Sequence, residues 1–229
     1  MTGYPELTFT LTDGSQVSTS VRTLLNAGYA GRDQQGVAAH IAELAELGVP
    51  APTVTPALYP VSPYLASQTD EVPAQHAGTS GEAEWALVIT GTAPEDVLLT
   101  AACDHTDRRL EVHGVAWSKN AGPDVLARKA WRLVDVAERL DDLTLRAWAG
   151  DTEIQNGKLA ELLAPAYWLD VLRTRGLYEP GVVLISGTIP MHPGVDQFAE
   201  SWRVELADPS NGETIELAYR VRRLPDPIG

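Results

Sequence analysis

The chain has 229 residues, of which 44% are hydrophobic and 21% charged, and it carries a net charge of -14. This composition is typical of a globular protein, and the acidic balance argues against nucleic-acid binding, which needs a basic stripe. The apolar runs are much shorter than the roughly 20 residues of a membrane helix, so we expect no membrane span. The first residues lack the apolar core of a signal peptide, and Cys103 is the only cysteine. We therefore expect a cytoplasmic protein without an internal disulfide.

The N-terminal third predicts a hairpin and then a helix. Residues 7–11 alternate weakly, Asp13-Gly14 makes a turn, and residues 16–22 follow, a pattern typical of a β-hairpin. Residues 34–47 repeat apolar side chains at helical spacing, and Gly48 and Pro50 end that helix. Residues 49–79 are rich in Pro, Thr and Ser and predict an irregular connection with short strands.

Strands dominate the rest of the chain. The pattern predicts strands at 82–90, 96–102, 109–116, 144–148, 181–186, 198–206 and 214–222, and helices at 123–141 and 159–173. We see neither a repeat nor a domain boundary, so the expected fold class is α+β: a single β-rich domain of residues 1–229.

Three carboxylates form the first candidate site. Glu82 and Glu84 precede a buried apolar run, and residues two apart on a strand point to the same face. Side by side, the two charges repel unless a proton or cation lies between them. Asp104 follows another apolar stretch and could add a third ligand for Mg²⁺, Mn²⁺ or Ca²⁺. The alternative is an exposed strand edge with solvated glutamates.

Other polar residues suggest a catalytic partner for such a site. His40 and Glu43 share one face of the predicted helix, and a carboxylate beside an imidazole makes it a better general base. An ordinary surface pair is the alternative. Lys119 could stabilise a developing oxyanion, or it could be a solvated loop lysine.

In their order along the chain, these signals resemble the motifs of the fumarylacetoacetate hydrolase-like superfamily. The matching segments are Gly31-Arg32-Asp33, His40-Ile41-Ala42-Glu43, 47–52 (LGVPAP), 56–59 (PALY), Glu82-Ala83-Glu84, 103–109 (CDHTDRR), 150–157 (GDTEIQNG) and 180–190 (PGVVLISGTIP). The resemblance therefore runs from about residue 30 to the C-terminal region, and it is greatest to a bacterial branch of uncharacterised function.

The resemblance implies a fold, an activity and a set of site residues. The fold would be an incomplete, rolled β-barrel with peripheral helices, in which residues 1–30 form a hairpin extension and residues 31–48 a lid helix. The activity would be metal-dependent hydrolysis of a C–C bond in a small 1,3-dicarbonyl or 2-oxo acid through an enolate. The protein would form a homodimer.

Each site residue takes a role from the same resemblance. The implied metal ligands are Glu82, Glu84 and Asp104, which would hold Mg²⁺ or Mn²⁺, with Ca²⁺ as a further option. His40 and Glu43 would activate water and Lys119 would stabilise negative charge. Arg32, Gly187 and Thr188 would bind substrate, while Arg108 would support the carboxylates.

Several positions depart from the family pattern and leave the substrate open. Cys103 precedes Asp104 where the family commonly has Asn, and Val61 stands where the family has a lysine. The same site could support decarboxylation, hydration or isomerisation of a 2-oxo acid. A non-catalytic protein that binds a small molecule on this fold is a further alternative.

Overall fold

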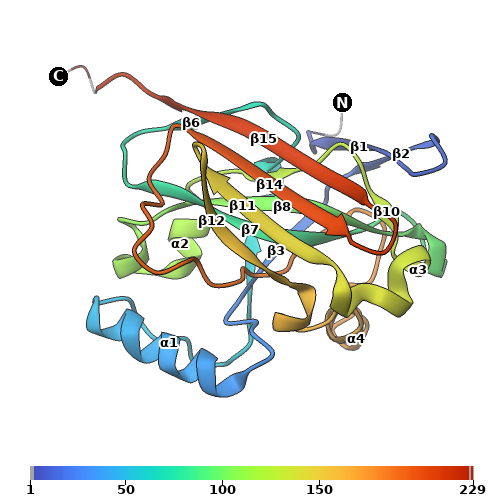
Figure 1. The fold of residues 1–229 in the computed structure, drawn as a ribbon, viewed down its shortest axis with the longest axis horizontal. Coiled ribbons are helices and arrows are strands. Elements are labelled where there is room, and N and C mark those ends of the chain that lie inside the picture. The colour runs from blue at the N-terminus through green and yellow to red at the C-terminus, as the bar shows by residue number, and fades with distance from the viewer. Residues whose placement is uncertain (1–2, 227, 229) are drawn as a thin grey trace.

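The computed structural model describes residues 3–226 and residue 228. Its strands form a two-stranded, an eight-stranded and a five-stranded sheet. The two-stranded sheet is the hairpin of β1 (Glu6–Thr10) and β2 (Gln16–Ser20). The α-helices of the described chain are α1 (Gln34–Glu46), α2 (Val115–Lys119), α3 (Leu133–Val136) and α4 (Pro165–Thr174). Figure 1 shows the helices around the edges of the sheets.

The eight-stranded sheet has the order β4-β3-β13-β7-β8-β9-β5, with β10 paired to β8. Its strands are β3 (Thr23–Gly28), β4 (Ala57–Val61), β5 (Ala66–Ser67), β7 (Thr79–Ile89), β8 (Val97–Asp107), β9 (Asp124–Leu126), β10 (Trp131–Arg132) and β13 (Val182–Ile185). The long antiparallel pair β7–β8 is its centre, and β13 joins the pair to β3 in a parallel register. Both long strands are buried on both faces, which explains their nearly continuous apolar sequences.

The five-stranded sheet has the order β12-β11-β14-β15-β6. Its strands are β6 (Glu71–Ala74), β11 (Thr144–Ala149), β12 (Thr152–Lys158), β14 (Ser201–Asp208) and β15 (Glu213–Arg223). Buried and more exposed residues alternate along β14, as they do on a strand with one solvated face. In Figure 1 this sheet crosses in front of β7 and β8.

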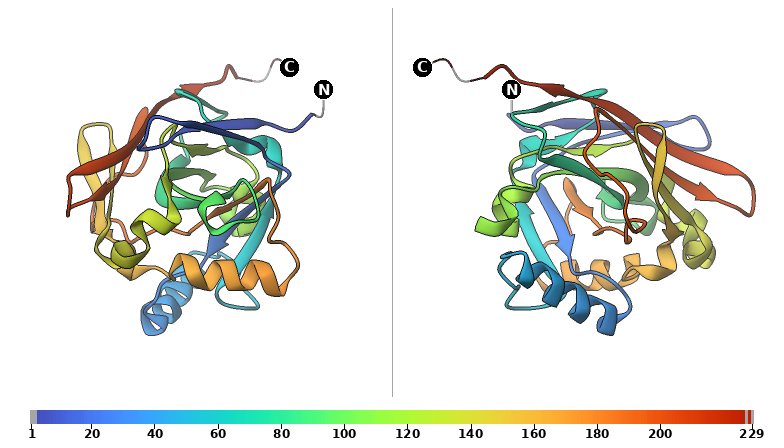
Figure 2. Two further views of the ribbon diagram at one scale, coloured as in Figure 1. Left: turned by 90° about the vertical axis from the view of Figure 1, so that its right-hand side faces the viewer. Right: turned by 60° about the vertical axis from the view of Figure 1, so that its left-hand side comes forward.

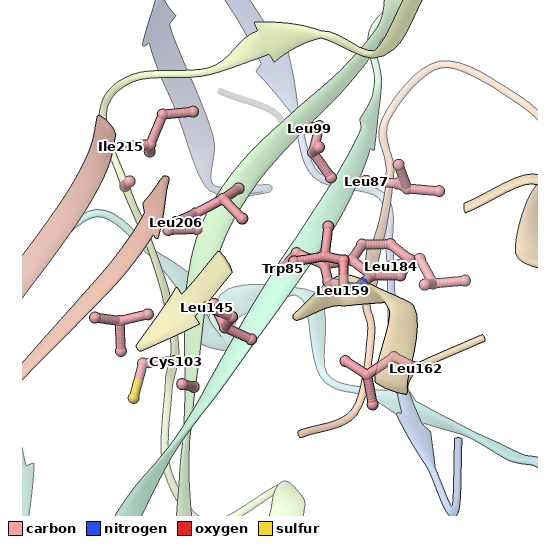
Figure 3. Close-up of a cluster of buried hydrophobic side chains, with 14 of the residues drawn as sticks. Trp85, Leu87, Leu99, Cys103, Leu145, Leu159, Leu162, Leu184, Leu206 and Ile215 are labelled. Atoms are coloured by element: carbon pink, nitrogen blue, oxygen red, sulfur yellow. The ribbon is translucent and has the colours of Figure 1, made fainter. Parts of the chain in front are cut away.

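The main hydrophobic core lies between these two sheets. Trp85, Leu87 and Leu99 of the large sheet belong to one cluster with Leu145 and Leu206 of the smaller sheet, and Figure 3 shows these side chains. All five side chains are fully buried. Because successive strand residues face opposite sides, the odd-numbered residues of β7 belong to this core and the even-numbered ones face the other way.

The second face of the large sheet encloses a smaller core. Ala86, Val88 and Leu98 lie there beneath Leu7 and Phe9 of the N-terminal hairpin. The large sheet is curled. Three strands separate β3 from β9 in the sheet, yet Asn26 of β3 donates a hydrogen bond of 3.1 Å to Asp124 of β9. Figure 2 shows this curvature from two further directions. The expected incomplete, rolled barrel with peripheral helices is therefore confirmed.

Helix α1 lies at the periphery of the molecule. Asp33 caps its N-terminus by accepting a hydrogen bond from the Gln35 N–H, and Val37 is its buried apolar contact. Most of the other described side chains of α1 are exposed. Within the described residues, the structure has no helix with the length and apolar character needed to cross a membrane.

Several predicted elements are confirmed, while others are wrong. The hairpin, the helix at 34–47 and the long strands match the structure closely. Residues 109–116 form no strand: Glu111–His113 is a 3-10 turn (η3), and α2 begins at Val115. Residues 123–141 are not one helix, because they contain β9, β10, α3 and a 3-10 segment.

Other boundaries also differ from the predictions. The predicted helix at 159–173 begins as α4 only at Pro165, and β12 was not predicted. Within residues 1–30, the hairpin covers only Glu6–Ser20, because Thr23–Gly28 pairs with β13 and β4 and so belongs to the large sheet.

Candidate metal centre

The three predicted carboxylates meet at one end of the curled sheet. Glu82 and Glu84 project from the same face of β7, and Asp104 on β8 is the direct register partner of Glu82. One carboxylate oxygen from each residue lies within 4.8 Å of the others. The antiparallel register therefore brings Asp104 next to a pair of glutamates that lies about 20 residues earlier in the sequence.

Two of these carboxylates are deeply buried and incompletely hydrogen-bonded. Glu84 and Asp104 have no exposed surface, and Glu84 Oε1 and Asp104 Oδ1 find no hydrogen-bond partner among the described residues. Burial raises the pKa of Glu84 well above its ordinary value, although the nearby Lys119 opposes this shift. Buried oxygens of this kind are costly unless a proton or cation satisfies them. The donor set therefore fits a hard divalent cation.

Lys119 is a buried partner of this cluster. It ends α2 with only 5% of its surface exposed, which rules out the solvated loop lysine considered from the sequence. Its Nζ lies 2.5 Å from Asp104 Oδ2 and 3.8 Å from Glu82 Oε2. Burial alone would lower the pKa of Lys119, but Asp104 and Glu82 raise it above the ordinary value, so the amine is charged.

Arg108 supports the carboxylates, as predicted. Its guanidinium lies 2.9 Å from Glu82 and 2.7 Å from Glu111, and its Nε donates a hydrogen bond of 2.6 Å to Ser80 Oγ. Burial raises the pKa of Glu111, and Arg108 opposes that shift. Glu111 was not identified from the sequence, because its segment was assigned to a strand; its spacing of three residues from Arg108 was the available signal.

Asp124 is a further buried carboxylate that sequence reasoning missed. It is the register partner of Asp104 on β9, and burial raises its pKa well above the ordinary value. A Cβ on Gly122 would lie 1.8 Å from the carbonyl oxygen of His105, so a glycine is needed for β9 to approach β8 this closely. The Gly122-Pro123 pair was the sequence signal for this strand start.

Gly187 and Thr188 hold the loop after β13 against β7. The Gly187 N–H donates a 2.5 Å hydrogen bond to Glu84 Oε2, and Gly187 has a positive φ of 84°. Thr188 Oγ1 donates to the Ala83 carbonyl at 2.8 Å and accepts from Gln155 Nε2 at 2.7 Å. Gly187 and Thr188, two of the three residues expected to bind substrate, therefore lie beside the carboxylates, with Gln155 as an additional support.

Two tyrosines lie beside the carboxylates. Tyr59 is the register partner of Asn26, and its ring packs so closely on Gly28 that a Cβ there would be 2.7 Å from the ring. Tyr29 has a φ of 56°, which is uncommon for a bulky residue. Burial raises the pKa of Tyr29 to about 12, and the charges of Glu111, Lys119 and Glu82 also act on it. Both phenols are thus neutral at physiological pH.

Comparison with known proteins places the chain in a family. The family described as "Protein of unknown function (DUF2848)" matches residues 27–219, most of the chain. The chain belongs to this family. No curated protein matches it.

Solved structures with similar folds cover nearly the whole chain. A fumarylpyruvate hydrolase from Pseudomonas aeruginosa, solved with Mn²⁺ and pyruvate, has a TM-score of 0.64 at 17% identity and covers 98% of this chain and 100% of its own. A fumarylpyruvate hydrolase candidate from Burkholderia cenocepacia has a TM-score of 0.66 at 16% identity, and the match covers 98% of this chain and 94% of that one. A 5-carboxymethyl-2-hydroxymuconate delta-isomerase from Mycobacterium smegmatis has a TM-score of 0.62 at 16% identity, and the match covers 96% of this chain and 99% of that one. The fold is therefore that of fumarylacetoacetate hydrolase-like proteins.

Arg32 and helix α1, which carries Glu43 and His40, lie apart from the carboxylates in the structure. Arg32 forms a bidentate ion pair with Asp141, at 2.8 and 2.9 Å, and its Nε donates to the Leu162 carbonyl. Glu43 is exposed on α1, which all three views place at the edge of the molecule, apart from β7 and β8. His40 belongs to the same helix, but its side chain lies outside the described part of the structure.

The structure also has a groove elsewhere on its surface. It has a volume of about 610 Å³ and lies between residues 52–59 and α4. Tyr59 contributes to its lining, together with Tyr167 and Trp168. The carboxylate cluster is therefore identified by its chemistry and burial, and not by the size of a cavity.

Proposed function

We propose that the protein is a divalent-metal-dependent enzyme that hydrolyses a C–C bond of a small 1,3-dicarbonyl or 2-oxo acid. The pair of buried, unpartnered oxygens, Glu84 Oε1 and Asp104 Oδ1, carries the proposal, because they lie where the third carboxylate of Glu82 completes a ligand set. The fold of the hydrolases and the isomerase described above supports it. Mg²⁺ or Mn²⁺ is the proposed cofactor, since all three ligands are hard oxygens.

The residues around the proposed metal ligands would have different roles in the reaction. When bound, the cation would act as a Lewis acid toward negative charge that develops on substrate oxygens. Lys119 neutralises Asp104 and places a fixed positive charge beside the reacting centre. Gly187 orients Glu84 through its N–H, and Thr188 fixes the adjoining loop, so both would also shape the substrate pocket.

Water activation would require α1 to move. In our proposal residues 31–48 act as a lid that closes on bound substrate and brings His40 and Glu43 to the reacting carbon, where His40 removes a proton from water. Arg32 would exchange Asp141 for a carbonyl oxygen of the substrate during closure. The peripheral position of α1 and the exposure of most of its side chains support a hinged segment.

A metal-binding experiment tests the cluster. Purified protein should bind one Mn²⁺ per chain in a calorimetric titration, and Glu82→Ala with Glu84→Ala should abolish binding. A double variant on the smaller sheet, Glu213→Ala with Glu216→Ala, removes the same charge from a solvated strand and should bind Mn²⁺ as the native protein does. Unchanged binding in the Glu82/Glu84 variant would show that the ion, if bound, is held elsewhere.

Decarboxylation is the second candidate reaction. It needs no attacking water, and the structure has α1 apart from the carboxylates, so the same cluster could act without His40 and Glu43. Acylpyruvate and oxaloacetate, each assayed with Mn²⁺, would distinguish the reactions. Acylpyruvate cleavage that falls in His40→Ala supports hydrolysis, whereas oxaloacetate turnover that is unaffected by His40→Ala supports decarboxylation.

A further inference from the structure

We propose that the substrate of this site carries a single carboxylate, and that Glu111, through its ion pair with Arg108, excludes ligands with a second carboxylate at their far end. This inference rests on the proposed function, because it assumes that a 2-oxo acid or 1,3-dicarbonyl binds at the metal centre. It assigns the role of specificity determinant to Glu111.

Among the described residues, the two basic groups that contact the cluster, Lys119 and Arg108, are already paired. Lys119 lies against Asp104 and Glu82, and Arg108 lies against Glu82 and Glu111. Arg108 is held on a third side by Ser80 Oγ, and only 15% of its side chain is exposed. A second substrate carboxylate would have to compete for the Arg108 guanidinium with Glu111, a carboxylate already in place at 2.7 Å.

The described groups around the cluster have no excess positive charge that could bind a second anion. Four carboxylates (Glu82, Glu84, Asp104 and Glu111) surround Lys119 and Arg108, and a bound divalent cation brings this group to neutrality. Counting Asp124 as well can only add negative charge. The carboxylate that chelates the metal introduces one negative charge. A further carboxylate would enter a partly buried, already negative environment, where like charges repel strongly.

The neighbouring wall offers neutral hydrogen-bonding groups instead. Tyr59 and Asn26 are opposite each other in the β3–β4 register, so their side chains lie on the same face of the sheet as the site. Tyr29 follows β3 and lies within reach of the charges of Glu111 and Lys119. Phenol and amide groups can bind a carbonyl, hydroxyl or amide, so the far end of the substrate is expected to be uncharged.

Three ligands of matched length separate charge from size. 2-Oxopentanoate, 2-oxoglutaramate and 2-oxoglutarate share the metal-chelating end and finish in a methyl, an amide and a carboxylate. We expect the Mn²⁺-loaded protein to bind the first two at least about tenfold more tightly than 2-oxoglutarate in calorimetric titrations. Equal or tighter binding of 2-oxoglutarate would overturn this inference and leave the proposed function intact. Failure of all three to bind in the presence of Mn²⁺ would instead overturn the proposed function.

Glu111→Gln tests the residue assignment. The substitution removes one negative charge and frees one side of Arg108, so the preference against 2-oxoglutarate should shrink by about tenfold or reverse. Glu216→Gln makes the same charge change on an exposed strand position and should retain the native preference. A Glu111→Gln protein that binds Mn²⁺ but keeps the full preference would contradict the role of Glu111. If that variant does not fold, the ligand series with the native protein still decides the substrate class.

Discussion

At the residue scale, the unusual feature of this protein is a charged lysine in its interior. Lys119 is almost entirely enclosed, and its Nζ contacts Asp104, which has no exposed surface. Removing two ions from water is costly, so a pair of this kind persists only when each charge compensates the other. The short helix α2 places the amine, because it ends at Lys119 and Asn120 fastens it to the Ser62 segment.

We expect Lys119→Met to destabilise the metal-free protein by about 3–5 kcal/mol, because Asp104 would remain buried without its partner. Mn²⁺ should reduce this loss, since a cation bound to Asp104 replaces part of the missing charge. Urea denaturation with and without Mn²⁺ measures both effects. Lys158→Met removes a lysine from an exposed pair with Asp142 and should cost less than about 1 kcal/mol. Equal, small losses in both variants would show that the buried pair contributes little.

The residues of the candidate site were predictable to different degrees. Glu82 and Glu84 could be paired from the sequence alone, because the alternation of a strand fixes which residues share a face. The burial of Lys119 could not be predicted from the sequence, since it depends on contact with Asp104, which lies 15 residues earlier on β8. Asp124 was missed for a similar reason: its position opposite Asp104 follows from strand register, which local sequence does not encode.

At the element scale, α1 differs from every other part of the site. The described carboxylates are fixed by sheet register, whereas α1 buries Val37 and the segment before it is held by the Arg32 N–H, which donates to the Glu161 carbonyl. A helix of 13 residues in water is only marginally stable by itself, so its ends and few contacts matter. These properties fit the proposed lid.

Asp33→Ala should loosen this helix without disturbing the sheets. Asp33 Oδ1 accepts a 3.0 Å hydrogen bond from the Gln35 N–H, and loss of such a cap costs about 1 kcal/mol. We expect faster amide hydrogen exchange across Gln34–Glu46 and a lower turnover, with unchanged Mn²⁺ affinity. Asp13→Ala, which removes a comparable bond to Ser15 in the N-terminal turn, is the control. Faster exchange in α1 with full activity would argue against the lid.

The wrongly predicted elements share a physical cause. Residues 109–116 alternate in hydrophobicity, but β8 ends at Asp107, and Val112 is exposed because no neighbouring strand pairs with this segment. Residues 124–126 are a strand because β8 and β5 pair with them, in a region whose local composition favours a helix. In both segments the tertiary environment overrides local preference. The long strands were predictable because burial on both faces leaves a continuous apolar run.

At the scale of the whole molecule, the Tyr219 hydroxyl makes polar contacts that join the two large sheets within their common core. His105 of β8 lies 2.9 Å from the hydroxyl of Tyr219 on β15 through Nδ1, and 2.9 Å from Thr79 Oγ1 through Nε2. The Tyr219 hydroxyl also contacts Cys103 Sγ at 3.3 Å. Cys103 is thus a buried packing residue. Because His105 is enclosed between the two large sheets, protonation of its imidazole should lower the free energy of unfolding of the whole protein.

Stability should therefore fall in mildly acidic solution. Burial lowers the pKa of His105 from 6.5 to about 4, and Arg108 adds to this shift. Between these values the unfolded chain binds a proton that the folded protein does not, so the contribution of His105 is complete above about pH 6.5 and is lost as the pH falls toward 4. The expected loss is about 3 kcal/mol.

Urea denaturation of His105→Gln across this pH range provides the measurement. The variant should have a free energy of unfolding that depends less steeply on pH, even if it is less stable at neutrality, because glutamine has no proton to gain. His192→Gln replaces an exposed histidine and should reproduce the native slope. The native protein and His105→Gln share every titrating group except His105, so the difference between their slopes isolates His105. Identical slopes for His105→Gln and the native protein would mean that this histidine does not link pH to the joining of the sheets.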